Sequence, residues 1–180
     1  SSPNTPGLRA LQSADALTSL IAAVQSELTE IGAELPLFVK VAPDLKERDI
    51  KDIAAVAISS SIDGVIVSNT TIARPQSLKA HHKAEHGGLS GKPLFEPSTA
   101  VLSEMYRHCA GKLPLIGVGG IASGENAYQK IRSGASLVQL YTALVYRGPR
   151  LITEIKRDLA ACLERDGFSS ITDAIGVDVK

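Results

Sequence analysis

Short apolar runs and helical patterns alternate along the whole chain. Apolar residues recur at helical intervals over residues 17–28, 50–57, 98–109, 125–133 and 151–163. Between these segments, short and nearly continuous apolar runs predict buried strands over residues 37–42, 63–69, 114–120 and 136–141. A polar stretch, roughly residues 70–97, separates the second strand from the third helix.

Several of these predicted helices begin with residues that favour helix N-termini. Ser13 or Asp15 can cap the first helix, and Ser98-Thr99 can cap the third. Pro149 suits the first turn of the last helix. The tail, residues 167–176, predicts irregular structure.

Buried strands joined by helices indicate an α/β fold with a parallel sheet, either open and covered on both faces or closed into a barrel. A doubly wound sheet would carry a G-x-G-x-x-G turn after an early strand. Residues 117–124 resemble that turn only loosely and come late in the chain, so the barrel is favoured. An eight-stranded barrel needs about 250 residues. The chain therefore predicts roughly half a (β/α)8 barrel, which an upstream segment would complete.

Composition narrows the class of partner. The 180 residues carry 19 basic and 19 acidic side chains, so a nucleic-acid partner is not expected and a small molecule is favoured. Runs of apolar residues stay short of the ~20 that a membrane-spanning helix needs. Two cysteines suggest a reducing compartment. The opening residues do not resemble a secretory signal, and the absence of an initiating Met suggests a piece of a longer chain.

A glycine-rich strand end is the first candidate for chemistry. Residues 117–120 read Gly-Val-Gly-Gly and precede a helix, a pattern that lets backbone amides approach a phosphate. Tyr141-Thr142 ends the next strand and can add amides or a hydroxyl. A tight turn without a ligand is the alternative.

Polar residues also follow the first two strands. Lys40 interrupts an apolar strand, which favours contact with an anionic cofactor or a Schiff base over a side chain that merely reaches solvent. Residues 68–71 offer hydroxyls and an amide to a ligand, although a polar turn is the simpler interpretation of Thr71.

Two other clusters are weaker on their residues alone. His81, His82 and His86 match no common metal-ligand spacing and favour a solvated loop, so no metal site is predicted. Residues 1–5, Ser-Ser-Pro-Asn-Thr, hold hydroxyls and an amide, but a serine is a weak base without activation and a plain turn is favoured.

Six motifs taken in series resemble the dihydroorotate dehydrogenase family. They occupy residues 1–5, 39–44, 67–71, 87–94, 116–120 and 134–141. The resemblance is to the class 2, quinone-linked branch, because class 1 enzymes carry a cysteine where this chain has Ser2. The tail at residues 172–176 also resembles class 2.

The resemblance implies a (β/α)8 barrel that holds FMN and oxidises dihydroorotate to orotate in pyrimidine biosynthesis. Ser2 would be the general base that removes the C5 proton, while hydride passes from C6 to the flavin. Asn4, Asn69 and Thr70 would bind the substrate, and Thr5 would help to relay the proton.

The same resemblance implies a set of cofactor contacts. Lys40 would lie beside the flavin ring, and the remaining contacts would be Ser68, Gly91, Gly120, Tyr141 and Thr142. Residues 1–180 would form the C-terminal part of a single FMN-binding barrel, whose upstream half is absent from this sequence.

Partners follow from the resemblance as well. A quinone would reoxidise the flavin, and segments upstream of Ser1 would supply the quinone site and a peripheral membrane contact. The location would be the bacterial cytoplasmic membrane, or the mitochondrial inner membrane in a eukaryote. Two alternatives stay open: a phosphate-binding isomerase or lyase that uses Lys40, and an inactive half-barrel fragment.

Overall fold

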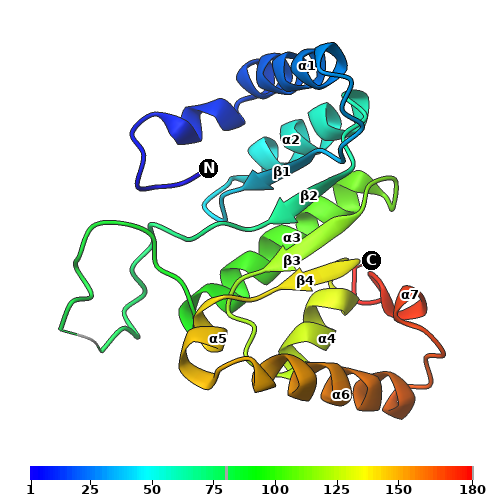
Figure 1. Cartoon of the computed structure of the whole chain (residues 1–180). Helices are drawn as coiled ribbons and strands as arrows, with labels where there is room; N and C mark the ends of the chain where they lie inside the picture. Colours follow the sequence, from blue (N-terminus) through cyan, green and yellow to red (C-terminus); the bar gives the residue numbers. More distant parts are fainter. Residues whose placement is uncertain (80, 180) are drawn as a thin grey trace.

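The computed structural model describes residues 1–79 and 81–179, which form one four-stranded parallel sheet (Figure 1). The strands lie in the order β1-β2-β3-β4, and each pairs with the next one along the chain. Their bounds are Phe38–Val41, Gly64–Val67, Leu115–Val118 and Leu137–Gln139. The four predicted strands are therefore confirmed, each within a few residues.

Helices connect the strands, as a parallel sheet requires. Helix α2 joins β1 to β2, α3 joins β2 to β3, and α4 joins β3 to β4. The helical elements are η1 (Leu8–Gln12), α1 (Ala14–Glu30), α2 (Glu47–Ser59), η2 (Lys92–Leu94), α3 (Phe95–Cys109), α4 (Gly124–Arg132), α5 (Thr142–Arg147), α6 (Arg150–Arg165) and α7 (Ile171–Ala174). Within the described ranges, none of these helices has the length and apolarity needed to cross a bilayer.

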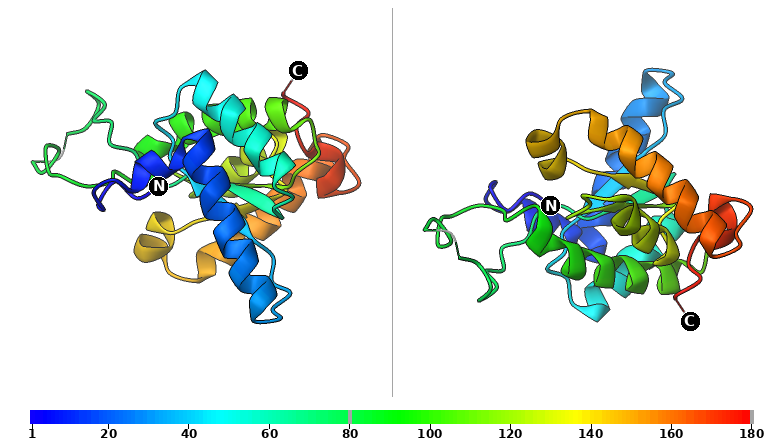
Figure 2. Two further views of the ribbon diagram at one scale, coloured as in Figure 1. Left: turned by 90° about the horizontal axis from the view of Figure 1, so that it is seen from above. Right: turned by 90° about the horizontal axis from the view of Figure 1, so that it is seen from below.

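The carboxyl ends of the strands share one edge of the molecule with other segments. In Figure 1 the strand arrows point toward the side where the N-terminal segment, the described loop residues 70–79 and 81–91, and α5 lie. Figure 2 shows the same loop extending beyond the strands, on the side away from the C-terminus. Residues that follow different strands are thereby brought to one place.

The sheet has one covered face and one more open face. Val41, Val65 and Leu115 are fully buried and belong to a core that also takes side chains from α2 and α3. On β1 and β4, by contrast, Phe38 and Leu137 are exposed by 38% and 62%. The prediction of burial therefore holds for Val41 and is wrong for Phe38 and Leu137, whose strands form the two edges of the sheet. This α/β arrangement matches part of a (β/α)8 barrel, in which helices cover only the outer face.

The start of α3 also differs from the prediction. Ser98 and Thr99 do not cap it: they lie inside the helix, buried, with their hydroxyl oxygens 3.1 and 2.7 Å from the Phe95 carbonyl oxygen. The helix begins at Phe95 and includes Pro97 in its first turn. Proline is tolerated there because the first amides of a helix have no intrahelical acceptor.

Four short elements were not predicted from the sequence patterns. They are η1, η2, α5 and α7, with five, three, six and four residues. A segment of that length is too short to display helical periodicity, so α5 was missed and the tail that holds α7 was predicted to be irregular. The position of α5 matters because it directly follows β4 at the edge described above.

A network of charged side chains ties the end of the chain to α4. Asp166 accepts hydrogen bonds from Tyr128 at 2.7 Å, Arg165 at 2.8 Å and Arg132 at 2.9 Å. Arg132 also bonds Asp178 in the tail. The bonds from Arg165 and Tyr128 hold the pKa of Asp166 well below its ordinary value.

We expect this network to make stability sensitive to acid. Because the pKa of Asp166 is lower in the folded state, its contribution is present above the ordinary value of 3.8 and is lost as the pH falls below it. Asp166→Asn should therefore lower the free energy of unfolding at pH 7 and weaken its decline in acid. Urea unfolding at pH 7 and pH 3 measures both effects.

The matched control is Asp52→Asn, which breaks an exposed pair with Arg48 at 3.7 Å. Such a pair contributes little to stability. If Asp166→Asn and Asp52→Asn give the same pH dependence as the parent protein, the Asp166 network does not set the acid sensitivity.

Candidate functional site

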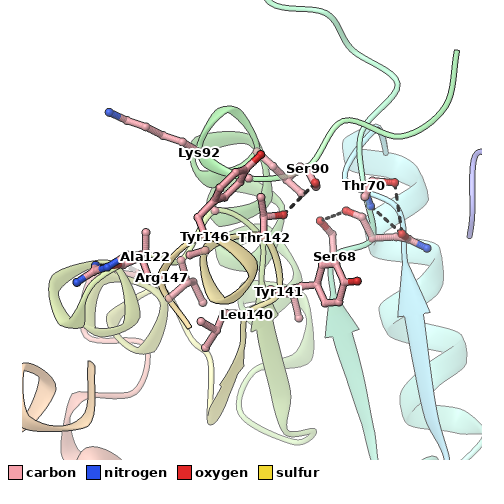
Figure 3. Close-up of a pocket in the computed structure, with 18 of the residues that line it drawn as sticks. Ser68, Thr70, Ser90, Lys92, Ala122, Leu140, Tyr141, Thr142, Tyr146 and Arg147 are labelled. Carbon is pink, nitrogen blue, oxygen red and sulfur yellow. Dashed lines mark hydrogen bonds between the residues drawn. The ribbon is translucent and has the colours of Figure 1, made fainter. Parts of the chain in front are cut away.

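A cleft of about 560 Å³ opens at the carboxyl ends of the strands (Figure 3). This volume lies within the range of small-molecule and cofactor sites. Residues in or just after each of the four strands contribute, together with the loop before α3 and with α5. The described lining residues are Lys40, Ser68, Asn69, Thr70, Ser90, Gly91, Lys92, Leu94, Val118, Gly119, Gly120, Ile121, Ala122, Leu140, Tyr141, Thr142, Ala143, Tyr146 and Arg147.

The glycine turn after β3 lies against the start of α3. Gly120 has φ +72°, and a Cβ there would lie 2.5 Å from Phe95 Cβ and 2.7 Å from Phe95 Cα and N. At Gly119 (φ +122°) a Cβ would lie 2.5 Å from Ser98 Oγ. Glycine is therefore required by both backbone conformation and close packing, and the turn presents backbone to the cleft.

The wall contributed by η2 and α5 is held together by small polar residues. Thr142 Oγ1 donates to Ser90 Oγ at 3.0 Å, a bond drawn in Figure 3. A Cβ on Gly91 would lie 3.1 Å from Thr142 Cγ2, so the loop before α3 approaches α5 closely. Tyr141 precedes α5 and is 78% exposed. Hydroxyls and backbone of two separate loops thus face the same cleft.

The ends of β1 and β2 form the opposite side. Lys40, in β1, lines the cleft with an exposed side chain. Ser68 is buried, and its hydroxyl donates to the Asn69 carbonyl at 2.9 Å. Asn69 Oδ1 accepts the Thr70 amide at 2.8 Å. The side-chain nitrogen of Asn69 points beyond β2, toward the N-terminal segment.

The N-terminal segment lies beside this side of the cleft. Asn69 Nδ2 donates to Ser1 Oγ at 3.1 Å, and the Gly88 amide donates to Asn4 Oδ1 at 3.2 Å. Ser2 Oγ accepts the Asn4 amide at 3.2 Å. Ser2 and Asn4 lie outside the described lining of the cleft. Asn4 instead contributes to a second hollow, formed with the loop that contains Arg74.

The loop of residues 72–88 returns to the end of β2. Thr71 and Leu89 exchange backbone hydrogen bonds of 3.1 and 2.8 Å. Gly88 packs so closely against Thr70 that a Cβ on Gly88 would lie 1.9 Å from Thr70 Oγ1. The N-terminal segment, the end of β2 and this loop therefore converge at one corner.

Sequence reasoning missed two residues that organise this corner. Asp44, just beyond β1, accepts hydrogen bonds from Arg9 at 2.8 Å, from the Ile72 amide at 3.1 Å, and from Thr71. Arg9 also donates to the Thr70 carbonyl at 3.0 Å. Thr71, predicted to lie in a plain polar turn, is buried. The position of Asp44 at a strand end could have marked it as a candidate. Its partners Arg9 and Thr71 are 35 and 27 residues away in the sequence, so the local pattern could not identify them.

The histidines of the long loop take no part in the cleft. His81, His82 and His86 are exposed, as expected for a solvated loop, and His82 lies 2.8 Å from Glu85. Among the residues with described positions, no group of three or more His, Cys, Asp or Glu is arranged to hold a metal ion.

The charges of the cleft favour an anionic ligand. Its charged side chains, among the described lining residues, are Lys40, Lys92 and Arg147. Arg147 is held by the Ala122 carbonyl at 2.8 Å and by Glu154 at 2.6 Å. Lys92 extends away from the Ser90–Thr142 pair in Figure 3. Cations, glycine backbone and apolar side chains such as Leu140 can together hold a flat ligand that carries a phosphate.

Comparison with known proteins agrees with this arrangement. The family model described as "Dihydroorotate dehydrogenase" matches residues 1–163. "Dihydroorotate dehydrogenase (quinone), mitochondrial" of Oryza sativa subsp. japonica is 58% identical over 100% of this chain and 39% of its own length. "Dihydroorotate dehydrogenase (quinone)" of Xanthobacter autotrophicus is 55% identical over 100% of this chain and 52% of its own length. The chain thus spans about half or less of the length of these relatives.

Solved structures share the fold. The ligand-free enzyme of Eimeria tenella superposes with a TM-score of 0.95 at 45% identity, covering 100% of this chain and 54% of that one. The same enzyme in complex with ferulenol also gives 0.95, covering 99% and 52%. On the family match, the identities and the fold, the chain belongs to the dihydroorotate dehydrogenase family, in its class 2, quinone-linked branch.

Proposed function

We propose that this chain forms the C-terminal part of a single FMN-binding (β/α)8 barrel that oxidises dihydroorotate to orotate in pyrimidine biosynthesis. One observation carries the proposal: the six residues predicted to contact the cofactor all line one cleft, although they come from different strands and loops. They are Lys40, Ser68, Gly91, Gly120, Tyr141 and Thr142. Asn69 and Thr70, predicted to bind substrate, line it too.

The residues present fit FMN. The phosphate would bind at the glycine turn and at the start of α5, where Gly120, Tyr141 and Thr142 offer backbone amides and a hydroxyl. Lys40, on the far side of the cleft, would lie by the flavin ring and favour its anionic reduced form. When bound, FMN would supply the hydride acceptor.

The chain's own residues would bind the substrate and move its proton. Asn69 and Thr70 would bind dihydroorotate from the end of β2, and Asn4 would do so from the N-terminal segment. Ser2 would take the proton from C5. The hydrogen bond from the Asn4 amide to Ser2 Oγ supports this role, because a donated hydrogen bond favours the deprotonated hydroxyl. Thr5 would pass the proton onward.

The acceptor and the location are proposed from the relatives. Those relatives are named as quinone enzymes, and the rice protein is named as mitochondrial. We propose that a quinone reoxidises the flavin of this protein too. Contact with the bacterial cytoplasmic membrane, or with the mitochondrial inner membrane in a eukaryote, would be peripheral and made by the upstream half. The relatives support an oxidoreductase and give no support to a Lys40 isomerase or lyase.

An anaerobic absorbance titration tests the function. The sample is the complete barrel, in which this chain is joined to the upstream half. Adding dihydroorotate should bleach the flavin absorbance near one equivalent, and adding a quinone should restore it. A yellow protein that keeps its colour with excess dihydroorotate would contradict the proposed substrate, and a colourless protein that takes up no FMN would contradict the proposed cofactor.

A further inference from the structure

A fully buried lysine lies behind the glycine turn. Lys130, in α4, has 0% exposure, and it packs on the covered face of the sheet, where a Cβ on Gly117 would lie 3.2 Å from Lys130 Cβ. Burial of an ammonium group is costly unless partners compensate for the lost water. Nothing in the proposed reaction uses Lys130, so its burial needs another explanation.

The Lys130 amine reaches the first turn of α3. Its Nζ donates to Ser98 Oγ at 2.6 Å and, more weakly, to the Phe95 carbonyl at 3.4 Å, and it lies 4.9 Å from the centre of the Phe95 ring. Ser98 Oγ lies in turn 3.4 Å from the Gly119 carbonyl oxygen. A short chain of contacts therefore runs from Lys130 through Ser98 to the glycine turn.

These contacts influence which carbonyl accepts the proton of the Ser98 hydroxyl. The hydroxyl has one proton and two candidate acceptors, the carbonyls of Phe95 at 3.1 Å and Gly119 at 3.4 Å. Thr99 already donates to the Phe95 carbonyl at 2.7 Å, and Lys130 adds a second donor there. Since a carbonyl has two lone pairs, Thr99 and Lys130 compete with Ser98 for the Phe95 carbonyl, and the Gly119 carbonyl is the acceptor without a second side-chain donor among these contacts.

The orientation of the Gly119 carbonyl determines where the next backbone N–H, that of Gly120, points. In a planar trans peptide the C=O and the next N–H point in opposite directions. The Gly119 carbonyl faces Ser98 in the protein interior, so the Gly120 N–H faces the opposite way, toward the cleft that Gly120 lines. An amide held in that direction is a preorganised donor for a phosphate oxygen.

We propose that Lys130 is a positioning residue for the phosphate subsite. It acts through Ser98 to hold the Gly119–Gly120 peptide with its N–H toward the ligand, and its buried ammonium adds positive potential behind the turn. The proposal rests on the proposed function, because it assigns the phosphate of FMN to this turn. It concerns the affinity for the phosphate group and leaves the flavin ring contacts unchanged.

The ionisation of Lys130 is consistent with this role. Burial lowers the pKa of Lys130 to about 7, and the nearby Glu96 carboxylate opposes that shift. An anion held at the turn also favours the charged form of the amine. A bound phosphate and a protonated Lys130 therefore stabilise each other.

The test compares FMN with riboflavin, which lacks only the phosphate. Dissociation constants of both ligands are measured by flavin fluorescence on the complete barrel stripped of cofactor, for the parent and for Lys130→Met. A hydrogen bond from a charged group corresponds to roughly a ten- to hundredfold change in affinity. We expect Lys130→Met to weaken FMN binding by about that factor, while riboflavin binding changes by less than about twofold.

Two further variants keep the test decisive if Lys130→Met disturbs the fold. Ser98→Ala interrupts the same series of contacts with a smaller change in side-chain size. It should also weaken FMN binding while leaving riboflavin binding nearly unchanged. Lys156→Met removes an exposed positive charge from α6 and should alter neither affinity.

Equal weakening of FMN and riboflavin by both interior variants would overturn the proposal, since it would indicate a packing role. Unchanged FMN affinity in both variants would overturn it too. If the parent protein bound FMN no more tightly than riboflavin, the phosphate site in the proposed function would be wrong, which is a separate result.

Discussion

Ser2→Ala should lower turnover of dihydroorotate by a factor of about 10² to 10⁴ while the protein keeps its flavin, since this is the range that a positioned general base contributes. Ser2 lies outside the cleft lining, so its hydroxyl can be removed without touching the predicted cofactor contacts. Stopped-flow reduction of the flavin by dihydroorotate isolates the step that the base serves. The absorbance spectrum of the purified variant reports flavin content.

Ser2→Cys provides the matched comparison. A thiol has an ordinary pKa near 8.5, far below that of an aliphatic hydroxyl, so the cysteine variant should recover part of the reduction rate and reach its maximum at a lower pH. Normal flavin reduction in Ser2→Ala would remove Ser2 from the mechanism. A loss that accompanies loss of flavin would instead mark Ser2 as a structural residue.

The parts of the fold that follow from local pattern were predictable. Strands β2 and β3 combine continuous apolar residues with a turn at each end, and the structure confirms both. The cleft followed from one topological rule: parallel strands bring their carboxyl ends to one edge. That rule was sufficient to group Lys40, residues 68–70 and the glycine turn, which are far apart in the sequence.

What the sequence could not reveal depends on contacts between distant segments. Lys130 looks like a surface residue of a short amphipathic helix, yet it is fully buried, and its side chain reaches Ser98 at the start of α3. Ser98 resembles a helix cap, and only the structure shows that it lies between Lys130 and the glycine turn. Asp44 is similar: a polar residue at a strand end becomes important through Arg9 and Thr71.

The exposed edges of the sheet show a different limit. An apolar strand predicts burial, but β1 and β4 are the edge strands of this sheet, and the strands that would cover them belong to the proposed upstream half of the barrel. Phe38 and Leu137 are exposed in this chain, although apolar residues in a strand predict burial. A complete barrel would bury them. The proposal that an upstream half completes the barrel accounts for both.

Gly120→Ala should abolish tight FMN binding and destabilise the protein. A methyl group at Gly120 would overlap the backbone of Phe95 at 2.7 Å, and backbone at the start of α3 cannot move aside as a flexible side chain can. The left-handed conformation costs a non-glycine residue roughly 1–2 kcal/mol, and overpacking adds about 1–3 kcal/mol. If the turn moves to relieve the overlap, the amides that would hold the phosphate move with it. Urea unfolding measures the destabilisation, and flavin fluorescence measures the affinity.

Gly111→Ala separates the two causes, because Gly111 has the same φ of +72° and its Cβ would have no atom within 4 Å among the described residues. It lies in the turn after α3, outside the cleft lining. This control should lose only the conformational part of the stability, roughly 1–2 kcal/mol, and should bind FMN as the parent does. Gly120→Ala should lose more stability than Gly111→Ala and should lose FMN as well. If the two variants behaved alike in both measurements, close packing of the glycine turn against α3 would not be what shapes the phosphate site.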